Sequence, residues 1–289
     1  MIKKGIILAG GKGTRMSPLT KAVNKQLLPL YDKPLIFYPL SALMLAGIRD
    51  ILIIVNKGQL NQFRKILPEN NNLGIKIQYK EQQNPNGLPE AFIIGEKFIG
   101  KNSVALILGD NFFYGQSLTK ILKKNINQKK GAKIFLHPVK NPQNYGVAVL
   151  NSKKKVVKLI EKPKKSKSNL AVTGLYFFDN KVIELSKKLK PSKRGELEII
   201  DLLNLYRKKS RLKAELIGRG GAWLDTGNVK DYYNASNFIS TIESRQGLKI
   251  ACLEEIAFNY GWIKKKDILE SIKFYGNCDY SKYLRSILG

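Results

Sequence analysis

Short apolar runs alternate with longer amphipathic segments along the first half of the chain. The runs are rich in Ile, Val and Leu, which predicts buried β-strands, while the segments between them repeat apolar residues at helical spacing. Strands are expected at residues 5–9, 50–55, 75–79, 104–108 and 134–139, and helices at residues 34–46, 59–67 and 88–98. Such alternation is typical of crossover units, in which helices cover both faces of a parallel sheet.

The second half of the chain is less regular. Strands are predicted at residues 147–150, 156–160 and 171–178, and helices at residues 198–208 and 230–243. From about residue 236 onward the pattern is helical and irregular. We therefore expect an α/β fold: a Rossmann-like, mostly parallel mixed sheet with helices on both faces, and a C-terminal helical appendage. Ligands bind at the carboxyl ends of the strands in such sheets.

The composition is that of a protein with a full core and no membrane span. With 289 residues and 43% hydrophobic side chains, the chain can bury a core of ordinary size. No apolar run approaches the roughly 20 residues that a membrane span needs, and the N-terminus lacks a signal-peptide pattern. We therefore expect a soluble, cytoplasmic protein with no membrane partner.

Cysteine and histidine are too sparse to suggest the chemistry they usually carry. Cys252 and Cys278 stand alone, without the spacing of a zinc site or a disulfide framework. The single histidine, His137, lies in an apolar run, which favours a structural role. Mechanisms built on a histidine triad or a histidine-ligated metal are therefore disfavoured.

The formal net charge of +29 invites comparison with nucleic-acid-binding proteins. Only nine of the 51 basic residues are Arg, however, and the Lys residues are spread along the whole chain. A nucleic-acid reader would more often concentrate Arg on one face and interleave aromatic residues. We expect no specific nucleic-acid partner, and most of these lysines should lie on solvated surfaces.

Three glycines, Gly10, Gly11 and Gly13, directly follow the first predicted strand. Without a Cβ, backbone N–H groups in such a turn can approach an anion closely, and turns of this kind commonly cradle phosphate. The spacing matches neither the dinucleotide fingerprint, because Met16 stands where its third glycine would fall, nor a P-loop. Arg15 and Lys25 could grip phosphate oxygens, although a tight turn with two solvated cations remains an alternative.

Two acidic residues, Asp110 and Asp225, each end an apolar run. Placement at strand ends would bring both to one edge of the sheet. Two carboxylates there suit Mg²⁺, which binds a few hard oxygens and completes its shell with water and phosphate. Alternatively, Asp110 caps a turn and Asp225 pairs with a cation.

Motifs at ordered spacing along the chain are similar to those of the sugar-1-phosphate nucleotidyltransferases, and the resemblance extends from residue 3 to about residue 288. They are Leu8-Ala9-Gly10-Gly11-Lys12-Gly13-Thr14-Arg15-Met16, Lys25-Gln26-Leu27-Leu28-Pro29, Leu108-Gly109-Asp110-Asn111, Tyr145-Gly146-Val147, Glu161-Lys162-Pro163, Pro191 to Ile199 and Ala222-Trp223-Leu224-Asp225-Thr226-Gly227.

The resemblance implies that glucose 1-phosphate attacks the α-phosphorus of dTTP, giving dTDP-glucose and pyrophosphate, the first step toward dTDP-L-rhamnose. Two polyanions must meet, so catalysis would come from alignment and charge neutralisation, without a covalent intermediate. The alternatives are a related enzyme using another nucleoside triphosphate or sugar phosphate, and a regulatory homologue without activity.

Site residues carry over from the family in four groups. Arg15, Lys25 and Lys162 would be catalytic, and Asp110 and Asp225 would hold Mg²⁺. Nucleotide-binding residues would be Gly10, Gly11, Gly13, Thr14, Gln82, Gly87 and Asp110, with Gln82 and Gly87 at the edge of thymine. Residues for the sugar phosphate would be Asn111, Tyr145, Gly146, Glu161, Lys162, Val172, Tyr176 and Arg194. Trp223 is interpreted as either pocket wall or core.

The resemblance also implies an organisation. Residues 1–235 would form the catalytic core, with a nucleotide-binding part to about residue 120 and a sugar-binding part from about 121 to 235; residues 236–289 would form a C-terminal assembly and effector-site segment in a homotetramer. Thr119 and Asn259 stand where relatives commonly have His and Arg in an effector site. Losing a cation there weakens binding of a diphosphate, so we expect reduced feedback inhibition.

Overall fold

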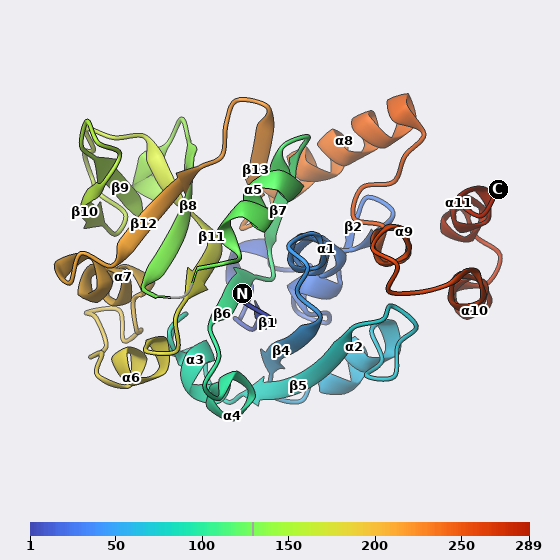
Figure 1. The fold of residues 1–289 in the computed structure, drawn as a ribbon, viewed down its shortest axis with the longest axis horizontal. Coiled ribbons are helices and arrows are strands. Elements are labelled where there is room, and N and C mark those ends of the chain that lie inside the picture. Colours follow the sequence, from blue (N-terminus) through green and yellow to red (C-terminus); the bar gives the residue numbers. More distant parts are fainter. Residues whose placement is uncertain (129) are drawn as a thin grey trace.

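The structure is a computed structural model that describes residues 1–128 and 130–289 (Figure 1). Its strands are β1 (Lys4–Ala9), β2 (Pro29–Leu30), β3 (Lys33–Pro34), β4 (Asp50–Asn56), β5 (Lys76–Gln82), β6 (Val104–Leu108), β7 (Asn111–Gly115), β8 (Ala132–Pro138), β9 (Val147–Leu150), β10 (Val156–Ile160), β11 (Leu170–Phe178), β12 (Leu212–Leu216) and β13 (Gly221–Asp225). Its α-helices are α1 (Phe37–Leu45), α2 (Leu60–Ile66), α3 (Glu90–Ile94), α4 (Glu96–Ile99), α5 (Leu118–Asn125), α6 (Val182–Lys187), α7 (Ile199–Lys208), α8 (Val229–Gln246), α9 (Leu253–Asn259), α10 (Lys265–Tyr275) and α11 (Asp279–Ser286). Short 3₁₀ helices cover Thr14–Met16, Lys25–Leu27 and Pro142–Asn144.

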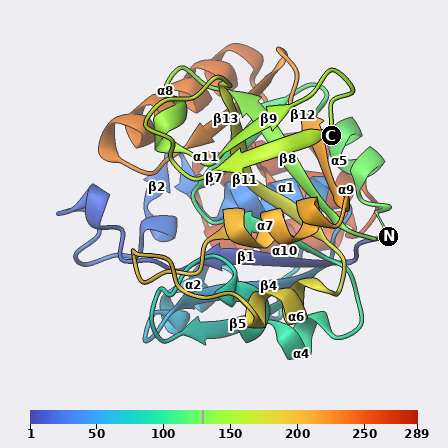
Figure 2. The same cartoon turned by 90° about the vertical axis from the view of Figure 1, so that its left-hand side faces the viewer.

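Within the described residues, nine strands form one mixed sheet. Its order is β10-β9-β11-β6-β1-β4-β5, with β8 pairing with β11 and β12 pairing with β8. The neighbours β6, β1, β4 and β5 are parallel, as the alternation of strands and helices in the first half predicts. Strand β11 is antiparallel to β6 and β8, and β9 is antiparallel to β10 (Figure 2 turns this end toward the viewer). The expected Rossmann-like mixed sheet is confirmed.

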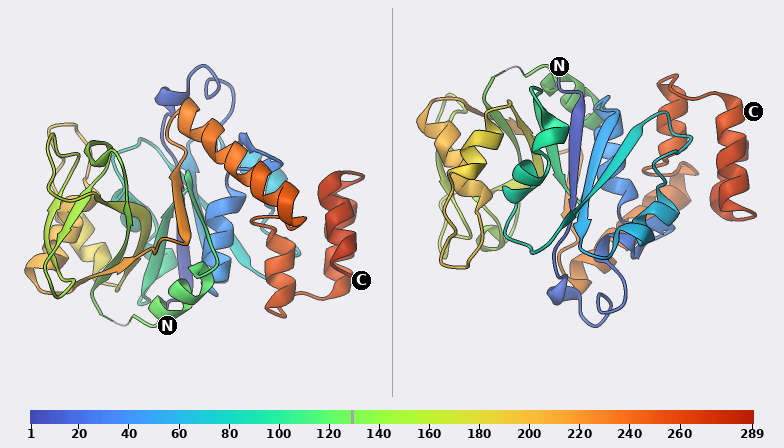
Figure 3. Two further views of the ribbon diagram at one scale, coloured as in Figure 1. Left: turned by 90° about the horizontal axis from the view of Figure 1, so that it is seen from above. Right: turned by 90° about the horizontal axis from the view of Figure 1, so that it is seen from below.

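Helices cover both faces of this sheet, and the alternation of side chains along β4 shows why. Ile51 and Ile53 belong to an apolar cluster that includes α1, α2, α5 and the C-terminal helices, whereas Leu52 and Ile54 belong to one that includes α3, α4, α6 and α7. The central residues of β4 are therefore buried whichever way they point, which explains its unbroken apolar run. Figure 3 shows the two helical layers on either side of the strands.

The C-terminal helices α9, α10 and α11 lie at one end of the molecule, next to α1 and α2 (Figures 1 and 3). The expected helical appendage is therefore present, and the suggested boundary at residues 235 and 236 falls inside α8. Phe238 and Ile239 of α8 pack in a core of this chain with Leu30 and Phe112. In the described part of the chain, no helix has the length and apolar character needed to cross a membrane.

The sparse cysteine and histidine residues lie where structural roles are expected. Cys252 is buried and Cys278 exposed, and both are free thiols. His137 is half-buried on β8, with Nε2 3.3 Å from the carbonyl oxygen of Gly221 and its ring beside that of Trp223.

A cluster of charged residues joins the β2–β3 loop to the end of α8. Lys33 is only 3% exposed, and its ammonium contacts Asp32 and lies 3.0 Å from Glu243 Oε1. Lys249 contacts Asp32 and lies 3.5 Å from Glu243 Oε2, while the N–H of Ile250 donates to Glu243 Oε1 at 2.8 Å. A buried cation and a buried anion thus satisfy one another at the point where the appendage begins.

Replacing Glu243 by Ala should lower the free energy of unfolding by about 2 kcal/mol, because Lys33 loses a buried partner and Ile250 loses its acceptor. Urea denaturation followed by circular dichroism measures this. Glu184→Ala is the matched control, because Glu184 pairs with Lys188 at an exposed position. The urea midpoint of this variant should equal that of the wild type. Equal losses in both variants would contradict a special role for the buried cluster.

Candidate active site

A cavity of about 400 Å³ lies at the carboxyl ends of β1, β5 and β6, where a sheet of this type is expected to bind ligands. It extends from the glycine turn after β1 to the predicted sugar-phosphate residues that follow β10 and lie on β11. Predicted site residues that line it are Gly10, Gly11, Arg15, Gln82, Gly87, Asp110, Asn111, Tyr145, Gly146, Glu161, Lys162, Val172, Tyr176, Arg194 and Asp225. The structure therefore brings together residues that span more than 200 positions of the sequence.

Three predicted residues lie away from this lining. Gly13 and Lys25 line a smaller adjoining cavity of about 190 Å³, which shares Gly11 with the main one. Thr14 is exposed at the start of a 3₁₀ helix and lines neither of the two cavities. The turn therefore borders two connected spaces, and Lys25 reaches the main site through Asp110.

The glycine turn is held by side chains that the sequence analysis did not single out. Gly11 has φ +100°, a conformation that favours glycine, and its N–H donates to Asn56 Oδ1 at 2.9 Å. Asn56 Nδ2 donates back to the Gly11 carbonyl at 2.9 Å. The Gly11 N–H, expected to hold nucleotide, is thus hydrogen-bonded to Asn56 in this structure. Asn24 Nδ2 donates to the Ala9 carbonyl at 3.2 Å and so anchors the segment that carries Lys25.

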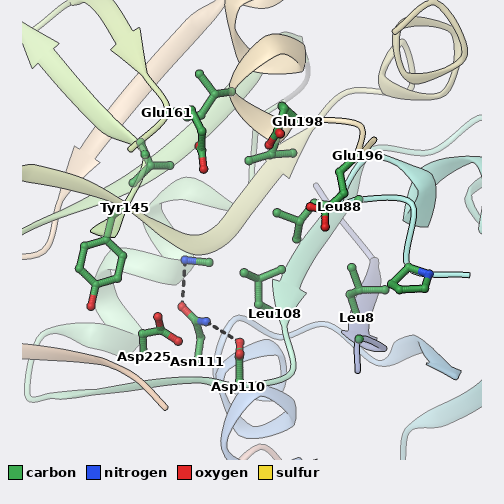
Figure 4. Close-up of a pocket in the computed structure, with 18 of the residues that line it drawn as sticks. Leu8, Leu88, Leu108, Asp110, Asn111, Tyr145, Glu161, Glu196, Glu198 and Asp225 are labelled. Atoms are coloured by element: carbon green, nitrogen blue, oxygen red, sulfur yellow. Dashed lines mark hydrogen bonds between the residues drawn. The ribbon is translucent and has the colours of Figure 1, made fainter. Parts of the chain in front are cut away.

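The two predicted metal ligands lie side by side because β13 pairs with β7. Asp225 stands opposite Asn111 in this antiparallel ladder, and the backbone N–H and hydroxyl of Thr226 donate to the Asp110 carbonyl at 3.1 and 2.9 Å. Figure 4 shows Asp110, Asn111 and Asp225 along one side of the cavity. The two acids therefore converge beside the cavity, but Asp225 reaches it from the separate two-stranded sheet β13–β7 and not, as expected, from an edge shared with the main sheet.

The charges around these carboxylates are unequal. Burial alone would raise the pKa of Asp110, but the Lys25 ammonium, 2.7 Å from Oδ2, holds that pKa below its ordinary value. Burial raises the pKa of Asp225, and the Asp110 charge raises it further, against the opposing effects of Lys25 and Arg15. Asp110 is therefore the anion that the protein already neutralises, while Asp225 lacks an equally close cation.

Arg15 lies beside Asp225, with Gly227 between them. A Cβ at Gly227 would lie 3.0 Å from Arg15 Nη2 and 3.2 Å from each carboxylate oxygen of Asp225. The missing side chain leaves room for the guanidinium to reach the cavity. Arg15 thus reaches the cavity on the side that carries the carboxylates.

Asn111 links the carboxylates to the wall of the cavity. Its Oδ1 accepts from Trp223 Nε1 at 2.6 Å and from the Gly174 N–H at 3.0 Å, and its Nδ2 donates to Asp110 Oδ1 at 3.0 Å. Trp223 is 8% exposed and lines the cavity, so it is both wall and hydrogen-bond donor. Its ring also packs edge-on against Tyr145 at 5.1 Å between centroids.

Acidic residues dominate the opposite side of the cavity. Figure 4 shows Glu161 and Glu198 there, across from Asp110 and Asp225. Burial, followed by the Glu198 charge, raises the pKa of Glu161. Arg194 Nη2 lies 2.7 and 2.8 Å from the two Glu198 oxygens and 3.5 Å from Glu161. The predicted phosphate ligand Arg194 is thus ion-paired here, and Glu198 and Glu196 are lining residues that the sequence analysis missed.

Lys162 follows β10 in a rarely populated backbone conformation. Its φ is +39°, a left-handed value that is uncommon for a residue with a side chain and that clusters at functional sites. Its N–H donates to the Tyr145 carbonyl at 3.1 Å, and its side chain is half exposed. The backbone holds the lysine at the edge of the cavity, with its ammonium 4.0 Å from Glu161.

One end of the cavity is formed by Gln82, which was predicted to read the base, and by the loop that follows β5. Gln82 is 3% exposed and ends that strand. Gly87 has φ +109°, and its backbone bridges to Leu197, so closely that a Cβ at Gly87 would lie 2.2 Å from the Leu197 carbonyl oxygen. Glycine is therefore required there on both conformational and steric grounds.

A separate cavity of about 550 Å³ lies between α1, β7 and the segment from the end of α8 into α9. Thr119 lines it, together with Tyr114, Lys249 and Glu255. Asn259, the last residue of α9, is exposed and is not among the residues around this cavity.

Comparisons with known proteins agree with this geometry. The model of the family described as nucleotidyl transferase matches residues 4–242. The chain is 50% identical to a glucose-1-phosphate thymidylyltransferase of Neisseria meningitidis serogroup A over 285 residues, which cover 99% of each protein. A Bacillus anthracis crystal structure, assigned provisionally as a glucose-1-phosphate thymidylyltransferase in complex with sucrose, has a TM-score of 0.75 at 38% identity, covering 81% of this chain and 94% of that one.

A second solved structure is a UDP-glucose pyrophosphorylase complexed with UDP-glucose. It has a TM-score of 0.74 at 28% identity and covers 84% of this chain and 100% of that one. The family match spans most of the sequence, and the curated relative matches it from end to end. This chain belongs to the nucleotidyl transferase family and is a nucleotidyltransferase enzyme.

Proposed function

We propose that this enzyme transfers a thymidylyl group from dTTP to glucose 1-phosphate, releasing pyrophosphate. The observation that carries the proposal is one cavity lined by the glycine turn, Arg15, two neighbouring carboxylates and a second polar region around Glu161. The first three suit a nucleoside triphosphate, and the last suits the hydroxyl groups of a sugar. The full-length relative named glucose-1-phosphate thymidylyltransferase supports this choice of substrates.

The triphosphate would lie along the glycine turn. Arg15 can grip two phosphate oxygens with its planar guanidinium, and Lys25 supplies a compact positive charge. Gly10, Gly11 and Gly13 leave room for the phosphates to approach the backbone, and Gly11 also borders the adjoining cavity. These groups would neutralise the pyrophosphate as it leaves.

A divalent cation fits between the nucleotide and the two carboxylates. Asp110 and Asp225 supply hard oxygen ligands, and the described residues contain no cluster of three or more His, Cys, Asp and Glu side chains that would form a closed cage. A pair of carboxylates suits Mg²⁺, which keeps water and phosphate oxygens in its shell. Asp225 is repelled by the Asp110 charge and has no close cation of its own, so a cation bound beside the two carboxylates would be favoured. When bound, Mg²⁺ would polarise the phosphate oxygens and reduce the repulsion between the substrates.

The sugar phosphate would bind on the opposite side of the cavity. Glu161 can accept hydrogen bonds from sugar hydroxyls, while the backbone of Gly146 and Val172 and the Tyr145 and Tyr176 side chains shape the space. Asn111 is held beside Asp110 and can contribute its remaining amide hydrogen. Lys162 and Arg194 would balance the phosphate charge, and Arg194 would exchange part of its contact with Glu198 for this phosphate.

In the reaction, an oxygen of the sugar phosphate forms a bond to the α-phosphorus of dTTP, and the bond to the β-phosphate oxygen breaks. The electron pair leaves with pyrophosphate, so no acid, base or covalent intermediate is needed. The protein would hold the two anions in line and offset their charges. The product, dTDP-glucose, would enter the route to dTDP-L-rhamnose in the cytoplasm. We also propose that the enzyme is a homotetramer. Because Thr119 and Asn259 stand where relatives commonly have His and Arg, we propose in addition that feedback inhibition is weakened.

Purified enzyme supplied with glucose 1-phosphate and Mg²⁺ should release pyrophosphate from dTTP faster than from UTP, dCTP or ATP. Coupled detection of pyrophosphate gives kcat/KM for each nucleotide. EDTA in excess over Mg²⁺ should abolish turnover, because Asp110 and Asp225 then face the phosphates without a cation. A clear preference for UTP would instead favour the activity named for the UDP-glucose pyrophosphorylase structure.

Asp225→Asn should reduce kcat/KM by about 100-fold or more, because the site loses a carboxylate charge that would hold Mg²⁺ beside the transferred phosphate. Stability should stay equal or rise, since the change removes repulsion with Asp110. Steady-state assays and thermal denaturation measure the two effects, and exposed Lys153→Ala controls for an unspecific charge change. Retained activity in Asp225→Asn would contradict the proposed metal site.

In Trp223→Phe, Asn111 loses a hydrogen-bond donor worth about 1 kcal/mol and therefore holds Asp110 less firmly. The Mg²⁺ concentration needed for half-maximal activity should rise, and kcat should fall by about tenfold. The aromatic packing against Tyr145 is retained in this variant. A metal titration at saturating substrates provides the measurement. An unchanged Mg²⁺ dependence with lowered stability would show that Trp223 only packs.

A further inference from the structure

Glu90 begins α3 immediately behind the base end of the cavity, without lining it. Its carboxylate accepts hydrogen bonds from three donors: Gln82 Nε2, the Asn86 N–H at 3.3 Å and Asn86 Nδ2 at 2.8 Å. One acidic side chain therefore holds both the last residue of β5 and the loop that follows it.

The contact with Glu90 determines which way the Gln82 amide faces. An ionised carboxylate has acceptors and no donor, so the Gln82 group turned toward it must be the NH₂. The carbonyl oxygen, Oε1, then points the other way, toward the glycine turn. The geometry of Gly10 agrees, because a Cβ there would lie 2.5 Å from Gln82 Oε1.

The Oε1 atom is available to a ligand. Among the described residues no protein donor hydrogen-bonds to it, and it is not among their buried polar atoms that lack a partner. Gln82 as a whole is 3% exposed, so the side chain is held by its surroundings and only a small part faces the cavity. The site thus presents one oriented acceptor at its base end.

We infer that Glu90 is a positioning residue that selects the pyrimidine by fixing this acceptor toward the base. The inference rests on the proposed function, in which Gln82 faces the nucleotide base. Thymine and uracil carry an N–H at position 3, which can donate to Oε1. Cytosine carries an unprotonated nitrogen there, and its lone pair would face the lone pairs of Oε1. Buried polar groups left unpaired in this way reject a ligand strongly.

The decisive probes are dUTP and dCTP, because they differ only at the edge that Gln82 would read. We expect wild-type enzyme to prefer dUTP in kcat/KM with glucose 1-phosphate. In Glu90→Leu the Gln82 amide loses its fixed acceptor and can flip, so that its NH₂ group also faces the base. The ratio of kcat/KM for dUTP to that for dCTP should therefore fall by about tenfold or more. In Glu90→Gln the side-chain oxygen can still accept from Gln82 Nε2, so most of the ratio should return.

Asn86→Ala is the matched control. It removes the hydrogen bond from Asn86 Nδ2 to Glu90, while the backbone N–H of residue 86 and the Gln82 contact stay in place. Its dUTP-to-dCTP ratio should stay within about twofold of wild type, since loosening the loop affects both nucleotides alike. An unchanged ratio in Glu90→Leu, or an equal fall in Asn86→Ala, would overturn the inference.

The experiment separates this inference from the proposed function. Absence of turnover with dTTP and glucose 1-phosphate in the wild type would refute the proposed reaction. In that case calorimetric binding of dUTP and dCTP to the same four proteins gives the ratio without turnover. A wild-type enzyme that binds dUTP and dCTP equally would overturn the role of Glu90 even if dTTP is a good substrate.

Discussion

Two carboxylates held together at a buried edge are the constraint around which this molecule is organised. Asp110 and Asp225 repel one another, and burial increases that repulsion because little water screens it. The backbone keeps them together: the β7–β13 ladder places Asp225 opposite Asn111, and Thr226 donates twice to the Asp110 carbonyl. Lys25 offsets one charge directly, which leaves the other as an attractive position for a cation.

Neutral polar side chains around the cavity are also held in place by their neighbours. Asn111 and Gln82 each carry an amide whose two ends are chemically opposite, and each is held by partners that accept only one orientation. Trp223 and Gly174 can only donate to Asn111, and Glu90 can only accept from Gln82. The cavity therefore presents fixed donors and acceptors before any substrate arrives, which reduces the reorganisation needed during the reaction.

Much of the fold follows from local patterns in the sequence. The strands at residues 104–108, 147–150 and 156–160 have the predicted bounds, and the ends of the parallel strands meet where the glycine turn and Asp110 were expected. The apolar run that ends at Asp225 was expected to be a strand end, but its partner β7 was not predicted, and neither was their pairing across more than 100 positions. The sequence therefore indicated the acid without showing the ladder that brings it into the site.

Contacts between distant polar side chains were beyond the reach of sequence patterns. Asn56 binding the Gly11 backbone and Trp223 donating to Asn111 leave no periodicity or spacing to detect. The glycines gave a clearer signal, because a missing Cβ has a local reason. Gly87 is an example, since its positive φ and its contact with Leu197 both require the smallest residue.

The bridge between Gly87 and Leu197 has a further consequence for how the cavity is bounded. It joins the loop that follows β5 to the segment that carries Arg194, Glu196 and Glu198, and the Leu197 N–H also donates to the Asn86 carbonyl at 2.7 Å. Main-chain atoms rather than rotatable side chains thus set the spacing between these two segments at the rim of the cavity. Rotamer changes can alter the side chains that each segment presents to the cavity. Widening the cavity at this rim, however, requires the two backbone segments themselves to move apart.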